Sequence, residues 1–228
     1  ANRLEIRRMY LPTQGGIGII TVNTGVVQSV LIEYYTALLQ AWQETLGRMS
    51  FMNNGRKNKA IEEAFNVALS NHQAGQLSQA KSIYEKIIHA DPNHSDALHL
   101  FGLIAHQTGN NDVAVEFINK AIRVNASCPS YFYNLGEVYR AMLRYDEALV
   151  SFRKALLLSH DFVNAHVGLG NVFMAQGKHD LALGSYREAL SLKPDYAEVY
   201  NNIGNAFMEQ GLLDQALASY RKALSLKS

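Results

Sequence analysis

The chain has 228 residues, of which 48% are hydrophobic and 18% charged, and its formal net charge at pH 7 is +1. This composition excludes an intrinsically disordered chain, and the near-zero charge provides no overall field for nucleic acid or an anionic membrane. A single cysteine, Cys128, excludes an internal disulfide bond. A lone thiol fits a reducing compartment, so we expect a cytoplasmic protein.

Charge is distributed unevenly along the chain. Residues 1–60 contain seven Lys or Arg and three Asp or Glu, a local charge of +4. Residues 61–228 contain fourteen and seventeen, a local charge of −3. We place a boundary near Met52 to Arg56, which predicts an N-terminal extension over residues 1–57 and a second region over residues 58–228.

The extension begins with a segment that contains one candidate strand. Ile17 to Val22 has the composition of a short strand but no recognisable partner. The uncharged stretch from Leu11 to Ile32 contains four glycines, which disfavours a membrane-spanning helix.

Apolar residues at helical spacing follow, among them Tyr34, Trp42 and Leu46, and they predict an amphipathic helix over about residues 25–48. We expect this helix to cap the region that follows it. A dimer interface and a membrane-surface helix are the alternatives. A membrane-surface helix usually carries lysines, whereas the charged residues between Val27 and Leu46 are Glu33 and Glu44, so this second alternative is disfavoured.

A period of 34 residues governs the rest of the chain. Glycines and alanines recur at this interval. A large, mostly apolar residue follows each of the recurring alanines at a distance of four residues. Small side chains let two helices approach closely, and the residue at i+4 on the same face fills the gap between them. The recurring sets are Gly102, Gly136, Gly170 and Gly204; Ala80, Ala114, Ala148, Ala182 and Ala216; and Tyr84, Ile118, Phe152, Tyr186 and Tyr220.

A second set of glycines predicts where the first helix of each unit ends, because a left-handed residue is least costly as glycine. Its members are Gly75, Gly109, Gly177 and Gly211, with Leu143 as the exception. An acidic residue then opens the next helix in four units, which complements the helix dipole. These residues are Asp112, Asp146, Asp180 and Asp214.

The pattern resembles the tetratricopeptide repeat family, with five repeats at residues 61–94, 95–128, 129–162, 163–196 and 197–228. The resemblance implies an all-α, right-handed superhelical solenoid preceded by the N-terminal amphipathic helix. It also implies that the first helix of each repeat lines a concave groove and the second lies on the convex side.

In this family the groove residues occupy set positions of the first helix, so the resemblance predicts a peptide-binding groove. Several positions carry asparagine, whose amide both donates and accepts hydrogen bonds and can hold the backbone of an extended peptide. The alternative is that these asparagines are solvated or connect neighbouring helices. The predicted groove residues are Asn66, His99, Tyr133, Asn134, Glu137, Arg140, Asn164, Asn171, Asn201, Asn202 and Asn205.

No motif for catalysis is present, and we expect neither an enzyme nor a bound cofactor. His89, His94, His99 and His106 are spaced five, five and seven apart, which does not place them on one helix face, so we predict no metal site. Family members that clamp the carboxylate of a peptide C-terminus use lysines on the first helices. Arg140 is the one Lys or Arg there in repeats two to five, so no such clamp is expected.

The resulting hypothesis is a scaffold that binds an extended peptide or a partner helix of another protein, and no nucleic acid. The alternative is the substrate-recruiting arm of a larger enzyme, because the run Tyr200 to Asn205 is similar to the repeat arm of O-linked N-acetylglucosamine transferases. The apolar edge with Leu217, Tyr220 and Leu224 favours a fragment of a longer chain. A homodimer through this edge or through the N-terminal helix is a further hypothesis.

Overall fold

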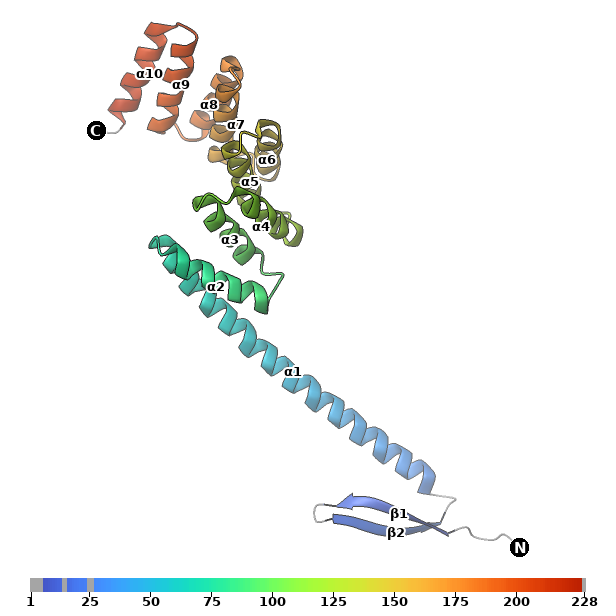
Figure 1. Ribbon diagram of the computed structural model, residues 1–228. Helices are drawn as coiled ribbons and strands as arrows, with labels where there is room; N and C mark the ends of the chain where they lie inside the picture. The colour runs from blue at the N-terminus through green and yellow to red at the C-terminus, as the bar shows by residue number, and fades with distance from the viewer. Residues whose placement is uncertain (1–5, 14–15, 24–26, 227–228) are drawn as a thin grey trace. The chain divides into compact units, whose positions relative to one another are not determined.

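The computed structural model describes the backbone of residues 6–13, 16–23 and 27–226, and the side chains of residues 40–44 and 54–226. The chain divides into two compact units, residues 1–60 and residues 61–228. Within these units lie two strands and ten helices in the described part of the chain (Figure 1).

The N-terminal unit contains a two-stranded antiparallel sheet. Strand β1 (Ile6–Thr13) pairs with β2 (Gly16–Asn23), and the register runs from Ile6 opposite Asn23 to Thr13 opposite Gly16. The second strand contains the predicted strand Ile17–Val22, and β1 is the partner that the sequence did not reveal. The two arginines and the proline of β1 do not indicate a strand by themselves. The strand forms because β2 provides its hydrogen-bonding partner, and such pairing cannot be seen in one segment alone.

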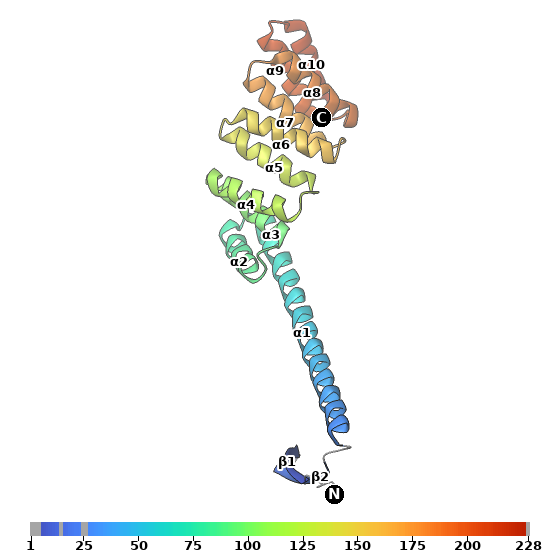
Figure 2. The ribbon, with the colours of Figure 1, turned by 90° about the vertical axis from the view of Figure 1, so that its right-hand side faces the viewer.

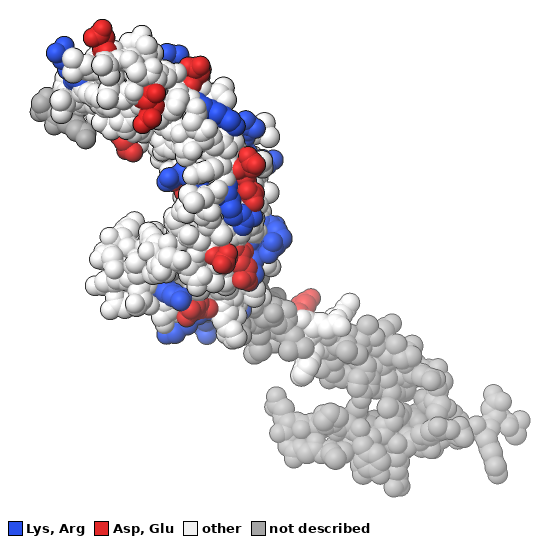
Figure 3. Space-filling model, turned by 45° about the horizontal axis from the view of Figure 1, so that its top comes forward, with Lys and Arg blue, Asp and Glu red and all other residues white. Residues whose placement is uncertain are grey.

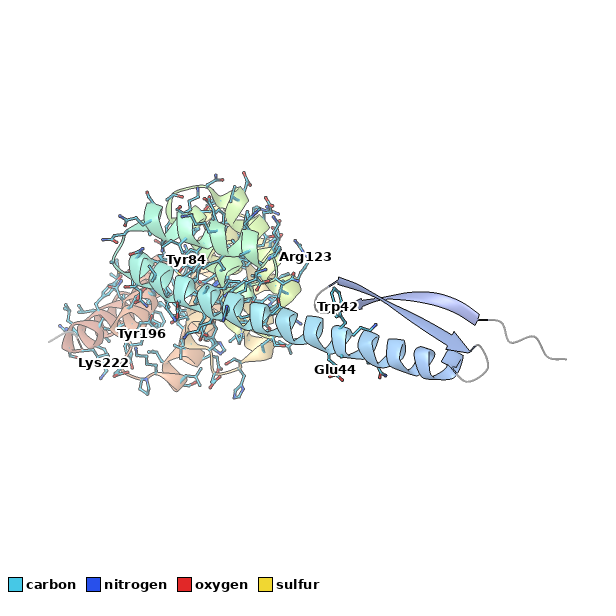
Figure 4. The ribbon with its side chains drawn as sticks, turned by 90° about the horizontal axis from the view of Figure 1, so that it is seen from below. Trp42, Glu44, Tyr84, Arg123, Tyr196 and Lys222 are labelled. Carbon is cyan, nitrogen blue, oxygen red and sulfur yellow. The ribbon has the colours of Figure 1, made fainter. Side chains whose placement is uncertain are left out.

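Helix α1 (Val27–Gln73) is longer than the helix predicted over residues 25–48, because it continues without a break into the first repeat. The charge boundary near Met52 to Arg56 therefore lies inside a helix. Glycine costs a helix interior about 1 kcal/mol, so Gly47 and Gly55 weaken the helix without ending it, and no proline interrupts it. The side chain of Trp42 is 68% exposed (Figure 4). The capping role of this segment stays a prediction.

Residues 61–226 form an all-α solenoid of five stacked helix pairs, as the repeat pattern predicts (Figure 2). The end of α1 pairs with the first of nine further helices, and each later pair packs on the one before it. The nine are α2 (Leu77–Ala90), α3 (Ser95–Gln107), α4 (Asn111–Val124), α5 (Pro129–Ala141), α6 (Tyr145–Leu158), α7 (Val163–Ala175), α8 (His179–Leu192), α9 (Ala197–Glu209) and α10 (Leu213–Ser225).

The periodic small residues are the contact points between helices. All five alanines from Ala80 to Ala216 in the 34-residue series have no exposed surface. The ring of Phe152 lies between two glycines, because a Cβ atom added to Gly136 on α5 or to Gly168 on α7 would meet its Cε1 atom at 2.6 and 2.7 Å. Glycine thus provides the close approach that brings α6 against both neighbours.

The first helix of each repeat ends in the same hydrogen-bonded turn. In the fourth repeat the amide of Gly177 donates to the carbonyl of Met174, and that of Lys178 donates to the carbonyl of Phe173, both at 2.9 Å. The glycine φ angles at this turn are between 70° and 82°. Leu143, the exception in the third repeat, adopts the same conformation with φ of 59°.

Candidate functional site

Hydrogen bonds between the first helices of neighbouring repeats bring the predicted groove positions together. Asn134 on α5 donates from Nδ2 to Nε2 of His99 on α3, at 2.8 Å. Asn202 on α9 donates from Nδ2 to Oδ1 of Asn171 on α7, at 3.3 Å. Both bonds run from the first helix of one repeat to the first helix of the next, so these side chains lie on the face where the first helices of neighbouring repeats meet.

A pocket of about 240 Å³ opens on this face between α5, α7 and the start of α9. Five of the predicted groove residues, from repeats three and four, line it together with Tyr196 at the end of repeat four and Glu198 of repeat five. The lining consists of Tyr133, Glu137, Arg140, Asn164, Val167, Gly168, Asn171, Tyr196 and Glu198. The pocket is the candidate site, and we refer to it below as the α5–α7–α9 pocket.

Two charges of the pocket neutralise each other. Arg140 donates from Nη2 to Oε2 of Glu137 at 2.7 Å, and from Nε to Oε1 and Oε2 at 3.3 and 3.2 Å. The hydrogen bond with this carboxylate raises the pKa of Arg140 above its ordinary value. Both side chains are part-buried, so the pair is a fixed feature of the pocket wall.

Tyr133 forms the aromatic wall of the pocket. Its ring packs against Phe152 and Phe162, with centroids 5.8 and 5.4 Å apart. Burial raises the pKa of Tyr133 to about 12, and the negative charges of Glu137 and Glu198 add to the effect. Arg140 lowers the pKa of Tyr133 and so opposes the effect of these two charges.

The asparagines divide into two groups. Oδ1 of Asn171 accepts the hydroxyl proton of Tyr186 at 2.7 Å, and Oδ1 of Asn205 accepts that of Tyr220 at 2.8 Å. In both pairs the tyrosine lies fifteen residues after the asparagine, a spacing that could have identified a structural role from the sequence. The amide of Asn164, by contrast, is exposed and forms no side-chain hydrogen bond to the described part of the chain.

The other predicted groove residues lie outside the pocket. The side chain of His99 is 7% exposed and its ring packs on Tyr131 with centroids 4.5 Å apart, so it offers a ligand little surface. Burial lowers the pKa of His99 to about 4. Those that do not line the pocket are Asn66, His99, Asn134, Asn201, Asn202 and Asn205.

The residues with described side chains contain no group of three or more His, Cys, Asp or Glu that could hold a metal ion. Among the helices that the structure describes, none has the length and apolar character needed to cross a membrane. Cys128 lies at the N-cap of α5 with a free thiol.

Models of tetratricopeptide repeats match most of the chain. They cover residues 33–94, 71–135, 129–162 and 197–228, and a further model described as TPR repeat covers residues 170–211. Among curated proteins, human tetratricopeptide repeat protein 7A is 24% identical over 136 residues, which are 54% of this chain and 16% of that protein. Human tetratricopeptide repeat protein 7B is 30% identical over 67 residues, 29% of this chain and 8% of that protein. The chain therefore spans a small part of these relatives.

Solved structures share the architecture over most of their own length. A crystal structure of MamA is 27% identical with a TM-score of 0.64, and the match covers 71% of this chain and 94% of that one. PilF of Pseudomonas aeruginosa is 20% identical with a TM-score of 0.68, covering 74% and 77%. YrrB, described as a TPR protein with an unusual peptide-binding site, is 23% identical with a TM-score of 0.59, covering 75% and 91%. The last two likenesses are of fold alone.

Proposed function

Since this chain belongs to the tetratricopeptide repeat family, we propose that its repeats bind an extended peptide segment of a partner protein at the α5–α7–α9 pocket. The protein is an interaction scaffold, and the pocket is the part of its concave face that receives the ligand. The observation that carries the proposal is that Tyr133, Glu137, Arg140, Asn164 and Asn171 line one cavity.

The chemistry of the pocket suits a peptide. Its exposed amide, Asn164, has a donor and an acceptor free for a backbone N–H and C=O. The Nδ2 group of Asn171 stays available because the hydrogen bonds of that residue use Oδ1. A pocket of about 240 Å³ accommodates a single side chain, whereas a partner helix is about 10 Å wide, so an extended ligand fits better.

The alternative, a recruiting arm of a glycosyltransferase, has less support. Its basis is the asparagine-rich run from Tyr200 to Asn205. In the structure Asn202 and Asn205 form hydrogen bonds within the repeats, and neither lines the pocket. These residues are therefore accounted for by packing, and the run gives no further reason to assign an enzyme partner.

The test is selection of binders from a library of random peptides on the full chain. Asn164→Trp fills the pocket with a neutral side chain, and Gln215→Trp makes the same kind of change at an exposed site on α10. We expect the selected peptides to bind the Gln215 variant like the unmodified chain and the Asn164 variant about tenfold more weakly, a loss of about 1.4 kcal/mol. Equal affinity for the two variants would show that the ligand binds elsewhere.

A further inference from the structure

The two sets of repeat helices differ in charge. The first helices α3, α5, α7 and α9 contain four acidic residues, Asp96, Glu137, Glu198 and Glu209, and one Lys or Arg, Arg140. The second helices, α2, α4, α6, α8 and α10, contain eight acidic and nine Lys or Arg residues. In the view of Figure 3, charged side chains run along one side of the array. The four first helices that carry the groove positions therefore have a net charge of −3.

Glu198 places part of this excess negative charge in the α5–α7–α9 pocket. Glu137 is neutralised by Arg140, but Glu198 forms no ion pair within the described part of the chain. Lys193, five residues before Glu198, lies with Nζ 4.5 Å from the centroid of the Tyr196 ring and forms no salt bridge in that region either. An exposed carboxylate thus lines the pocket without a salt-bridge partner in the described part of the chain.

The walls around Glu198 suit a cation. Tyr133 and Tyr196 contribute aromatic rings, and a cation is attracted to the face of such a ring. The ammonium of Lys193 lies 4.5 Å from the centroid of the Tyr196 ring, which is the geometry of such a contact. Asn164 adds an amide oxygen that can accept a hydrogen bond.

We propose that the α5–α7–α9 pocket binds the cationic side chain of an arginine or lysine in the peptide ligand, with Glu198 as its counter-ion. This inference rests on the proposed function and adds the charge of the ligand to it. The peptide backbone then contacts Asn164 and the free Nδ2 group of Asn171. An acidic side chain fits less well, because it would compete with Glu137 for Arg140 and would meet the uncompensated charge of Glu198.

The probes are blocked tripeptides, acetyl-Gly-Arg-Gly-amide and the same peptide with citrulline, a neutral isostere of arginine, or with glutamate. Each is titrated into the full chain at low salt, and binding is followed by two-dimensional amide NMR. The variant is Glu198→Gln, and the matched control is Glu209→Gln, which removes the same charge from the same helix outside the pocket. Because both carboxylates are exposed, circular dichroism should show an unchanged fold in both variants.

We expect the arginine peptide to bind at least about threefold more tightly than the citrulline peptide, with shifts at Asn164 and Asn171. Glu198→Gln should abolish this difference, and Glu209→Gln should preserve it. Equal binding of arginine and citrulline, tightest binding of glutamate, or no binding of any probe would overturn the inference. A further outcome separates the two proposals. If the selected peptides bind more weakly to the Asn164→Trp variant but equally well to the two glutamine variants, the proposed function stands and the preference for a cationic side chain is refuted.

Discussion

The Nε2 atom of His99 lies 2.8 Å from the Nδ2 atom of Asn134, thirty-five residues later. An amide nitrogen donates, so Nε2 must accept and the ring must be neutral, with its proton on Nδ1. Burial lowers the pKa of His99 to about 4, in keeping with this neutral form. The bond joins α3 to α5, so protonation of His99 would remove the acceptor of a contact between repeats two and three.

The first prediction concerns this pH dependence. The pKa of His99 falls from its ordinary 6.5 to about 4 on folding, so the unfolded chain binds the proton more tightly. Neutral His99 therefore contributes fully to the free energy of unfolding above pH 6.5. As the pH falls from 6.5 toward 4, this free energy should decrease by about 2–3 kcal/mol. Urea unfolding of the wild type and His99→Gln at a series of pH values measures it. The variant should lose less stability on acidification, whereas exposed His89→Gln should behave like the wild type.

A second prediction concerns the close approach of helices at Phe152. A Cβ atom at Gly136 would lie 2.6 Å from the ring, so Gly136→Ala should lower the free energy of unfolding by about 1–3 kcal/mol. Gly184 on α8 has no atom within 4 Å of the same addition, so Gly184→Ala should raise stability by about 0.5–1 kcal/mol through helix propensity. Thermal melts of both variants test this, and destabilisation by Gly184→Ala would contradict the open space around Gly184.

The third prediction uses the one turn that lacks glycine. Leu143 adopts a φ of 59° and its side chain is 70% exposed, so the residue carries backbone strain with little packing in return. Leu143→Gly should stabilise the chain by about 1 kcal/mol, since the left-handed conformation costs other residues about 1–2 kcal/mol. The opposite change at the equivalent turn, Gly177→Leu, should destabilise it. Denaturant midpoints measure both effects, and a lower midpoint for Leu143→Gly would argue against strain.

A fourth prediction compares two buried tyrosines at equivalent places in repeats one and four. Tyr186 donates to Asn171, whereas Leu69 takes the equivalent place in the first repeat and the Tyr84 hydroxyl has no partner in the described chain. Tyr186→Phe should therefore cost about 1 kcal/mol, because it removes a hydrogen bond. Tyr84→Phe should leave stability unchanged or raise it. Equal losses in chemical denaturation would mean that the Tyr84 hydroxyl is also satisfied.

The sequence alone determined the repeats. The 34-residue period identifies the alanine series from Ala80 to Ala216 and the glycine series from Gly102 to Gly204, which the structure buries between helices because only small residues permit backbones to approach closely. Gly168, which also contacts Phe152, lies outside these series. The period also predicts the turn at Gly177 and its equivalent at Leu143. These features depend on neighbours in the chain and on side-chain size, which a single sequence displays directly.

Tertiary structure decided the features that depend on distant segments. The pairing of β1 with β2 and the continuity of α1 do not follow from local composition, since each requires a choice between comparably stable local conformations. The asparagines illustrate the same limit, because sequence shows an amide but not its partner. Asn171 and Asn205 accept hydrogen bonds from tyrosines of their own repeats, whereas Asn164 is exposed and lines the same pocket as Glu198. Whether a polar side chain is free to bind a ligand depends on hydrogen bonds that only the folded chain forms.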